Sequence, residues 1–190
     1  MKMIKNRIEA SIHVKEMIMQ DNALLKRIAG AADAVAGSLH KGGKILLCGN
    51  GGSAADAQHI AAELSGRFYK DRDPLFAEAL HVNTSYLTAV ANDYGYDYIY
   101  ARLVKAKGRK GDVLFCISTS GNSDNILKAA EEAHHAGMLV IGMTGESGGN
   151  LKKSCDILLN VPSADTPRIQ ESHILMGHII CEITEIKLFS

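Results

Sequence analysis

The chain has 190 residues and carries 21 basic and 21 acidic side chains, so its formal net charge is zero. This length suits a single domain over residues 1–190, with residues 1–40 as a helical extension that packs on the core or on a neighbouring subunit. A balanced charge offers no broad basic surface to nucleic acid or to an anionic membrane. We therefore expect neither partner, and an anionic ligand must be bound locally.

The cysteines point to a reducing compartment. They are widely spaced, lie mostly in apolar stretches and lack the paired spacing of a zinc or redox motif. Buried free thiols fit best at Cys48, Cys116, Cys155 and Cys181. The N-terminus shows neither a long apolar run nor a small-residue cleavage site. We expect a soluble, cytoplasmic protein.

The first forty residues predict two helices. Apolar side chains recur at helical spacing from Ile4 to about His40. Asp21-Asn22 provides a break and an N-cap between the two helices. Such a pair commonly packs on a neighbouring layer or on another subunit, so no chemistry is assigned to it.

The next segment predicts a strand that ends in an anion-binding turn. The apolar run from Lys44 to Cys48 stops at Gly49-Asn50-Gly51-Gly52-Ser53, and a helix follows through Gly66. Backbone N–H groups are unpaired at a helix start and the helix dipole is positive there, which favours phosphate. Ser53 can both cap the helix and donate its hydroxyl to a phosphate oxygen. The alternative is an ordinary strand-to-helix turn, because the loop matches neither a P-loop nor a dinucleotide fingerprint.

The elements that follow predict a layered α/β protein. In chain order we expect a short strand at 77–82, a helix from Asn83-Thr84-Ser85 through Ala91, a turn at 92–95, a helix at 96–107, a strand at 113–117, a helix at 124–136, a strand at 138–143, a short helix, a strand at 156–161, and a long helix from about 168 to 187. The strands are almost continuously apolar. They indicate an open, mostly parallel sheet flanked by helices on both faces, of the flavodoxin or Rossmann type.

A second polar loop favours the phosphate interpretation. Ser118-Thr119-Ser120-Gly121-Asn122-Ser123 ends the strand at 113–117, and residues 144–150 form a third loop. Ligands of parallel sheets gather at the carboxyl ends of the strands, so we expect all three loops on one rim. Two serine-rich turns beside one crevice favour phosphate over plain turns. Hydroxyls and helix N-termini can bind phosphate with little help from cations.

Two side chains close to the first loop are candidates for chemistry. His59 and Glu63 are spaced i and i+4, which places them next to each other on one helix face. In an arbitrary protein such a pair is most often a surface or half-buried contact. The functional alternative is a base and its neighbour, or two metal ligands, beside the phosphate site.

The C-terminal helix adds polar residues to an otherwise apolar sequence, namely Gln170, Glu171, His173 and His178. A lone histidine on a core-facing helix is usually a core residue, but two histidines with a glutamate and a glutamine within three turns indicate a functional site. We interpret His81, His134 and His135 as structural. Asp93, which follows Asn92 in the predicted turn, either touches a ligand or simply forms the turn.

Several motifs together carry a family resemblance. They are Cys48-Gly49-Asn50-Gly51-Gly52-Ser53, Asn92-Asp93, the loop at 118–123, and Arg168-Ile169-Gln170-Glu171 with His173 and His178. Over nearly its whole length the chain resembles the phosphoheptose isomerases, a family of the sugar isomerase (SIS) domain superfamily. The resemblance implies an aldose–ketose isomerase that converts D-sedoheptulose 7-phosphate to D-glycero-D-manno-heptose 7-phosphate. That reaction is the first step towards nucleotide-activated heptose for surface lipopolysaccharide.

The resemblance also implies roles for individual residues. Glu63 would be the base and His178 the acid in proton transfer through a cis-enediol. The phosphate and the sugar would contact Asn50, Gly51, Gly52, Ser53, Asn92, Asp93, Ser118, Thr119, Ser120, Ser123 and Gln170. In members that carry zinc, one ion per subunit polarises the carbonyl, and the matching ligands here are His59, Glu63, Gln170 and His178. The family implies a homotetramer.

The spacing on the last helix constrains the site. Gln170 and His178 lie eight residues apart, about 12 Å along a straight helix, so one ion could hardly bind both. Either subunits share the site, which we prefer, or the helix bends or begins after Gln170. Two other functions stay open: an isomerase of another phosphosugar, and a non-catalytic SIS-domain protein that binds a phosphosugar or a protein.

Overall fold

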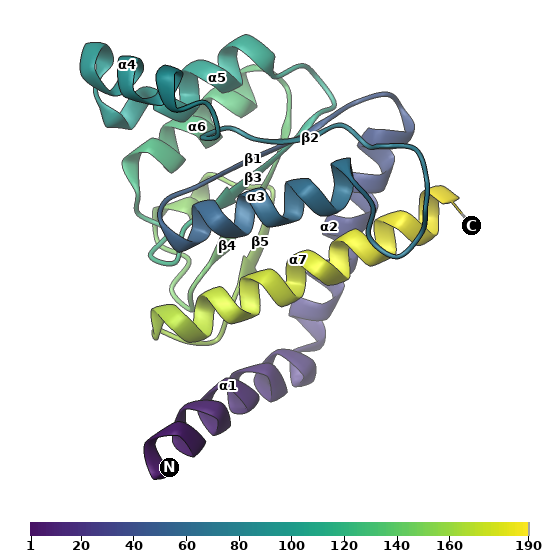
Figure 1. Cartoon of the computed structure of the whole chain (residues 1–190), viewed down its shortest axis with the longest axis vertical. Helices are drawn as coiled ribbons and strands as arrows, with labels where there is room; N and C mark the ends of the chain where they lie inside the picture. Colours follow the sequence, from purple (N-terminus) through teal and green to yellow (C-terminus); the bar gives the residue numbers. More distant parts are fainter. Residues whose placement is uncertain (190) are drawn as a thin grey trace.

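The centre of the protein is a parallel sheet, seen in a computed structural model that describes residues 1–189 (Figure 1). Its strands are β1 (Ile45–Gly49), β2 (Ala77–Ala79), β3 (Val113–Ile117), β4 (Leu139–Thr144) and β5 (Ile157–Asn160), arranged in the order β2-β1-β3-β4-β5. Each neighbouring pair is parallel. The predicted open α/β fold is confirmed, and this strand order is that of flavodoxin-like proteins.

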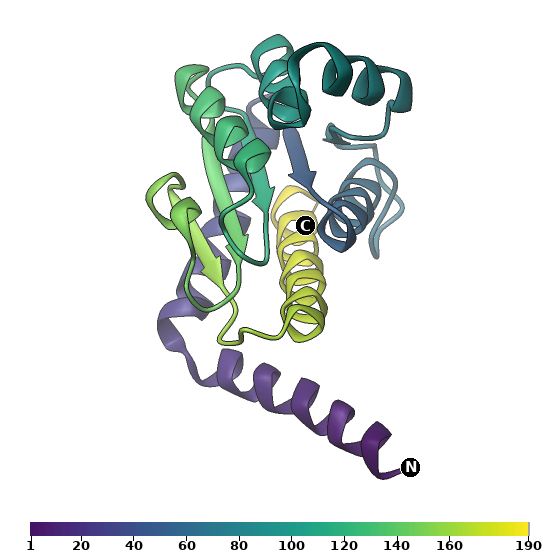
Figure 2. The ribbon, with the colours of Figure 1, turned by 90° about the vertical axis from the view of Figure 1, so that its left-hand side faces the viewer.

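Helices cover both faces of the sheet (Figure 2). They are α1 (Lys2–Gln20), α2 (Asn22–His40), α3 (Gly52–Ser65), α4 (Thr84–Tyr94), α5 (Ile99–Lys107), α6 (Asp124–His135) and α7 (Thr166–Phe189), with short 3-10 turns η1 (Tyr96–Tyr98) and η2 (Asn150–Lys153). Along β1, Ile45 and Leu47 join a core with α2, α3 and α7, whereas Leu46 and Cys48 join a core with α4, α5 and α6. Alternating strand side chains thus build two cores, which explains why the strands are apolar throughout.

The N-terminal helices differ in how they are packed. Asp21 separates them as predicted, and its carboxylate accepts hydrogen bonds from the N–H groups of Ala23 and Leu24 at 2.9 Å. Whereas α2 packs on the sheet, α1 points away from the body (Figures 1 and 2). An apolar row of Ile4, Ile8 and Ile12 on α1 is 56%, 55% and 49% exposed. Within the described residues, this row therefore has no covering layer.

Two predicted element boundaries were wrong, and one alternative is excluded. The strand expected at 77–82 ends at Ala79. The turn expected at 92–95 is helical, because α4 continues through Tyr94 until Gly95, whose positive φ of 92° ends it. The long helix expected at about 168–187 is confirmed as α7, which begins at Thr166 and so excludes the alternative of a helix that begins after Gln170. Across residues 1–189, every helix is too short or too polar to cross a membrane.

Candidate active site

The strand order places two loops beside one crevice. After β1 the chain returns to form β2 on one side of it, and β3 then pairs on the other side. The carboxyl ends of β1 and β3 are therefore neighbours at the point where the winding direction reverses, which is where ligands of such sheets bind. The loops that leave this point are residues 49–53 and 118–123.

The first loop turns sharply into α3. Gly51 is the N-cap residue with a positive φ of 56°, which favours glycine. Gly49 must also lack a side chain, because a Cβ there would lie 2.4 Å from the carbonyl oxygen of Ser53. The predicted cap role of Ser53 is wrong, since Ser53 already lies inside the first turn of α3. Its side chain is buried, and it lines a small cavity instead.

The second loop gathers serine hydroxyls. Ser118 Oγ lies 3.2 Å from Ser123 Oγ and 3.5 Å from Ser120 Oγ. Ser123 is the N-cap residue of α6, but its hydroxyl faces Ser118 instead of the helix backbone. These three oxygens therefore converge beside a helix N-terminus, as phosphate binding requires.

The two loops share one cavity of about 90 Å³. It is lined by Asn50, Ser53, Ile117, Ser118, Thr119, Ser120, Ser123 and Gln170. The N-termini of α3 and α6 both reach it, and its lining within residues 1–189 contains neither lysine nor arginine. A phosphate dianion there would be held by hydroxyls and helix dipoles.

Three side chains that support the first loop were missed from the sequence. Asn50 and Asn125 exchange two amide hydrogen bonds of 2.9 Å, and Tyr96 Oη donates to Asn50 Oδ1 at 3.2 Å. Tyr100 Oη donates to the carbonyl oxygen of Gly49. The side-chain amide of Asn50 is occupied by these bonds, so a ligand would be bound by the backbone of Asn50 and not by its side chain. The sequence signal that could have revealed this support is Asn125, a polar residue at a position that the helix pattern places in the core.

The third loop supports the second. The N–H of Gly145 donates to Thr119 O, and the N–H of Leu151 donates to Gly121 O, both at 2.9 Å. A Cβ at Gly121 would lie 2.2 Å from Gly148 O, so the two backbones touch directly. The loop at 144–150 thus shares the predicted rim and fixes the shape of the serine loop.

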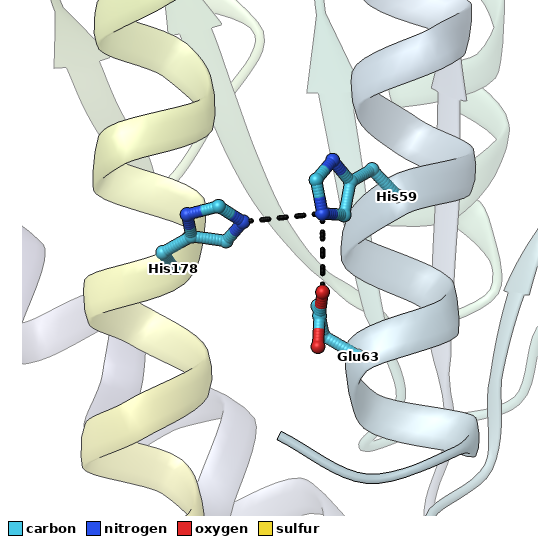
Figure 3. A group of neighbouring side chains, drawn as sticks. All are labelled: His59, Glu63 and His178. Carbon is cyan, nitrogen blue, oxygen red and sulfur yellow. Dashed lines mark hydrogen bonds and ion pairs between the residues drawn. The ribbon is translucent and has the colours of Figure 1, made fainter. Parts of the chain in front are cut away.

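A second polar group lies between α3 and α7 (Figure 3). His59 Nε2 is 3.1 Å from Glu63 Oε1 and 3.3 Å from His178 Nε2. Ligand atoms of all three residues lie within 4.8 Å of one another. The side chain of His59 is 49% exposed and that of Glu63 is 23% exposed, so a substrate can reach them.

The donor set of this group fits a metal ion. If His59 Nε2 carries a proton, it can donate that proton to Glu63. The single N–H then points at Glu63 and is not available as a full hydrogen bond to His178 Nε2, which lies 3.3 Å away. Without that proton, His59 Nε2 and the Glu63 carboxylate present lone pairs to each other. A cation would satisfy all three atoms. Two imidazoles and one carboxylate are the ligands of many catalytic zinc sites that keep an open position.

Comparisons with known proteins show the family to which this chain belongs. Residues 10–145 match the SIS domain family. The chain is 51% identical over 186 residues to phosphoheptose isomerase of Aneurinibacillus thermoaerophilus, covering 98% of this chain and 94% of that one. It is 57% identical over 163 residues to the Rhodospirillum rubrum enzyme of that name, covering 86% and 87%. This chain belongs to the phosphoheptose isomerase family.

Solved structures of phosphoheptose isomerases have the same fold. GmhA from Neisseria gonorrhoeae is 44% identical with a TM-score of 0.91, covering 97% of this chain and 98% of that one. The Francisella tularensis protein is 45% identical with a TM-score of 0.92, covering 97% of each. The predicted resemblance to the phosphoheptose isomerases, which rested on the combined motifs, is confirmed. The predicted alternative of a non-catalytic regulator is not supported, because the relatives are named isomerases.

In this phosphoheptose isomerase chain, Gln170 lies with the serine cavity. A Cβ at Gly52 would be 2.4 Å from Gln170 Nε2, so the side chain covers the start of α3. His178 follows eight residues later on the unbroken helix, about 12 Å away. The structure therefore brings His59, Glu63 and His178 together, and it places Gln170 of the same chain elsewhere.

Other candidate residues lie outside these two regions. Asn92 and Asp93 are exposed on α4, where Asn92 Nδ2 donates to Asp93 Oδ1 at 2.9 Å. His173 is fully buried, and its Nε2 lies 3.1 Å from Thr144 O. Burial lowers the pKa of His173 to about 4, although the hydrogen bond to Thr144 opposes this. His173 is therefore a neutral core residue. His134 pairs with Asp156 at 3.2 Å.

Proposed function

We propose that the protein converts D-sedoheptulose 7-phosphate to D-glycero-D-manno-heptose 7-phosphate, the first step of nucleotide-activated heptose biosynthesis. The observation that carries this proposal is that α3 contributes both Ser53, which lines the serine cavity, and Glu63. Ser53 lies at the start of α3 and Glu63 near its end. One helix can thus present a phosphate anchor and a base to opposite ends of a phosphosugar. The family name of the relatives supports the substrate.

Phosphate binding would supply positioning energy. Ser53, Ser118, Ser120 and Ser123 would donate hydroxyl hydrogen bonds, with Thr119 and the backbone of residues 50–52 beside them. The phosphate does not react, so its binding energy can hold the reacting carbons beside the base. Asn92, Asp93 and Gln170 would contact the sugar chain. Gln170 already lines the cavity.

The chemistry would move two protons. Glu63 would take a proton from C1 of the ketose and return it to C2, through a cis-enediol. His178 would move a proton from the C1 hydroxyl oxygen to the C2 oxygen, since an imidazole can both accept and donate near neutral pH. The resulting product has an aldehyde at C1 and a hydroxyl at C2. Atoms and charge balance without an external oxidant.

We propose that His59, Glu63 and His178 hold a zinc ion, with Gln170 of a neighbouring subunit as a fourth ligand. Bound zinc would polarise the carbonyl as a Lewis acid. Glu63 has two carboxylate oxygens, which permits one ligand contact and one proton transfer. Metal analysis of the purified protein tests this assignment, and His59→Asn should lower zinc content to well under one ion per chain.

We also propose a homotetramer with shared active sites that works in the cytoplasm. The exposed isoleucine row on α1 supports a subunit interface, because an uncovered apolar row of this kind marks a contact surface. The four cysteines are free thiols, as expected in a reducing compartment. Sedimentation tests the assembly. A stable monomer with full turnover would contradict shared sites.

The activity has a direct test. Purified protein is incubated with sedoheptulose 7-phosphate, and the aldose product is followed by nuclear magnetic resonance. Product should form with wild type and fail to form at a comparable rate with Glu63→Gln. If wild-type protein yields no aldose while it turns over another ketose phosphate, the substrate assignment is wrong and the reaction type stands.

A further inference from the structure

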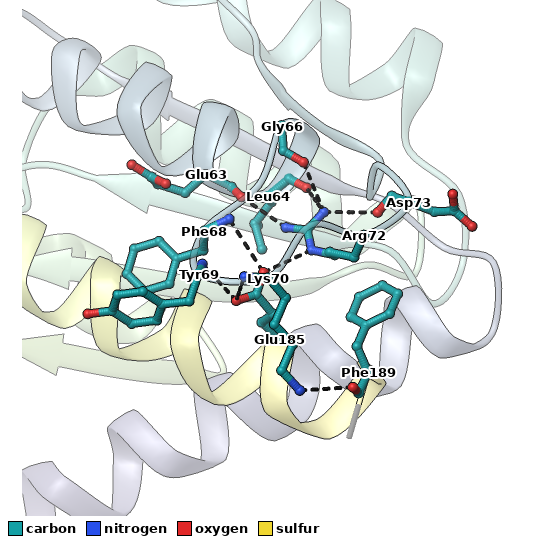
Figure 4. A network of polar contacts seen from close by, with 10 residues as sticks. All are labelled: Glu63, Leu64, Gly66, Phe68, Tyr69, Lys70, Arg72, Asp73, Glu185 and Phe189. Carbon is teal, nitrogen blue, oxygen red and sulfur yellow. Dashed lines mark hydrogen bonds and ion pairs between the residues drawn. The ribbon is translucent and has the colours of Figure 1, made fainter.

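A buried ion pair joins the far ends of the two helices that carry Glu63 and His178. Arg72, in the segment after α3, pairs with Glu185 on α7, with Nε and Oε1 3.1 Å apart (Figure 4). Each side chain is only 3% exposed. Burying two charges is costly, so this pair must be supported by further hydrogen bonds.

Glu185 organises the segment that follows α3. Its carboxylate accepts hydrogen bonds from the N–H groups of Tyr69 at 2.8 Å, Lys70 at 3.0 Å and Phe68 at 3.4 Å. Burial by itself would raise the pKa of Glu185, but these three bonds and Arg72 outweigh it and lower the pKa. Glu185 is therefore an ionised anchor for three consecutive backbone groups.

Arg72 caps the end of α3 from outside the helix. Its Nη1 donates to Leu64 O at 2.9 Å and to Gly66 O at 3.2 Å, and its Nη2 donates to Glu63 O at 3.0 Å. The last carbonyls of a helix have no partner within it. Lysine could not replace this arrangement, because the planar guanidinium points several donors in fixed directions.

Both proposed proton carriers touch this network. The backbone carbonyl of Glu63 is one of the groups that Arg72 binds. The ring of Phe68, whose N–H is bound by Glu185, lies 5.7 Å from the ring of His178 between centroids. His178 and Glu185 are seven residues apart, which places them on the same face of α7.

We propose that Arg72 and Glu185 are positioning residues that hold Glu63 and His178 at the distance proton transfer requires; this rests on the isomerase function proposed above. An apolar pair could fill the same space, but it could not fix carbonyl and N–H groups from both helices. A shift of about 1 Å at reacting groups can cost about a hundredfold in rate. The network therefore acts on turnover more than on phosphate binding.

The test compares kcat and KM in Arg72→Lys and Glu185→Gln. We expect kcat to fall between tenfold and a hundredfold, with KM for sedoheptulose 7-phosphate changed less than twofold, because the serine cavity lies at the other end of α3. Asp112→Asn is the matched control. Asp112 is a buried carboxylate 2.6 Å from Lys44 Nζ that accepts two backbone N–H groups, and its partners Lys44 and Arg109 are not part of the Arg72–Glu185 network.

The control separates positioning from general stability. Asp112→Asn should lower the thermal midpoint about as much as Glu185→Gln while it leaves kcat unchanged. If it lowers kcat equally, or if both network variants keep wild-type kcat, the proposal is overturned. Arg72→Lys keeps the charge and so provides a folded variant if Glu185→Gln does not fold.

A second readout needs no turnover. In protein with carbon-13-labelled histidine, the ring signals of His178 should shift in both network variants, because the Phe68 ring moves relative to it. The His134 signals should stay in place, since His134 pairs with Asp156 on another face. If wild-type protein does not turn over sedoheptulose 7-phosphate but the His178 signals shift, the proposed function is wrong, and the proposal that Arg72 and Glu185 position His178 is supported. Unshifted His178 signals would overturn the positioning.

Discussion

The serine cavity and the His59–Glu63–His178 group both use residues of α3 but are built in different ways. The cavity is made of backbone turns and hydroxyls at adjacent strand ends, and residues 1–189 contribute neither lysine nor arginine to its lining. The group is made of ionisable side chains that face each other across two helices. A rigid, neutral pocket suits binding of an unreactive phosphate, whereas titratable groups suit proton transfer.

This difference means that the two regions should be separable by substitution. Damage to the cavity should weaken substrate binding, and damage to the group should slow turnover. Ser53 and Glu63 are ten positions apart on α3, about 15 Å along the helix. The separation is large enough for each effect to be measured alone.

The largest effect is expected from Glu63→Gln. Glutamine has the same size but cannot carry the proton, so kcat should fall about a thousandfold with KM within twofold of wild type. Steady-state kinetics with sedoheptulose 7-phosphate measures both constants. Glu182→Gln removes an exposed carboxylate from α7 and should change neither. A tenfold rise in KM for Glu63→Gln would show that the two regions are not separable.

A large effect on stability is expected from His173, which lies on α7 between Gln170 and His178. Its pKa is lowered to about 4, so the unfolded chain binds a proton that the folded chain does not between about pH 6.5 and pH 4. Stability should therefore fall as the pH falls through this window, by about 3 kcal/mol from this group.

Urea unfolding from pH 7.5 to pH 4 measures this dependence. His173→Gln removes the titrating group, so its pH dependence should be flatter than that of wild type, although the variant is less stable at pH 7.5. His135→Gln is the control, because His135 is exposed at the end of α6. An equal pH dependence in wild type and His173→Gln would contradict the assignment.

A smaller effect is expected in the cavity. Ser118→Ala removes the hydroxyl at the centre of the three serines, so KM should rise about tenfold, equal to about 1.4 kcal/mol, with kcat little changed. Ser38→Ala is the matched control. Ser38 is also buried, but its hydroxyl donates to Gly111 O at 2.7 Å, far from the loops. If Ser118→Ala lowers kcat without raising KM, the conclusion that the cavity serves binding and the His59–Glu63–His178 group serves turnover is wrong.

The smallest effect is expected from Gly52→Ala. The new methyl group would displace the flexible end of Gln170 from the start of α3, so KM should rise a few-fold without loss of the fold. Gly37→Ala is the control, because space surrounds that glycine on α2 and alanine favours a helix by about 1 kcal/mol. An unchanged KM in Gly52→Ala would show that Gln170 does not contact the substrate.

The sequence by itself determined the elements and the edge of the sheet that binds ligand. Apolar strands, the Asp21 cap and the glycine-rich and serine-rich turns are local signals that act over a few residues. Because parallel strands end on one edge, these signals are enough to place the loops at 49–53 and 118–123 together.

Tertiary structure decided which side chains meet. His178 reaches His59 across 119 residues, and Arg72 reaches Glu185 across 113 residues, without any periodic pattern that links them. The structure also differs from two local expectations: α4 continues through Asn92 and Asp93 until Gly95, and Gly51 takes the cap position expected for Ser53. Local propensities are worth less than about 1 kcal/mol per residue, so burial and long-range hydrogen bonds decide such cases.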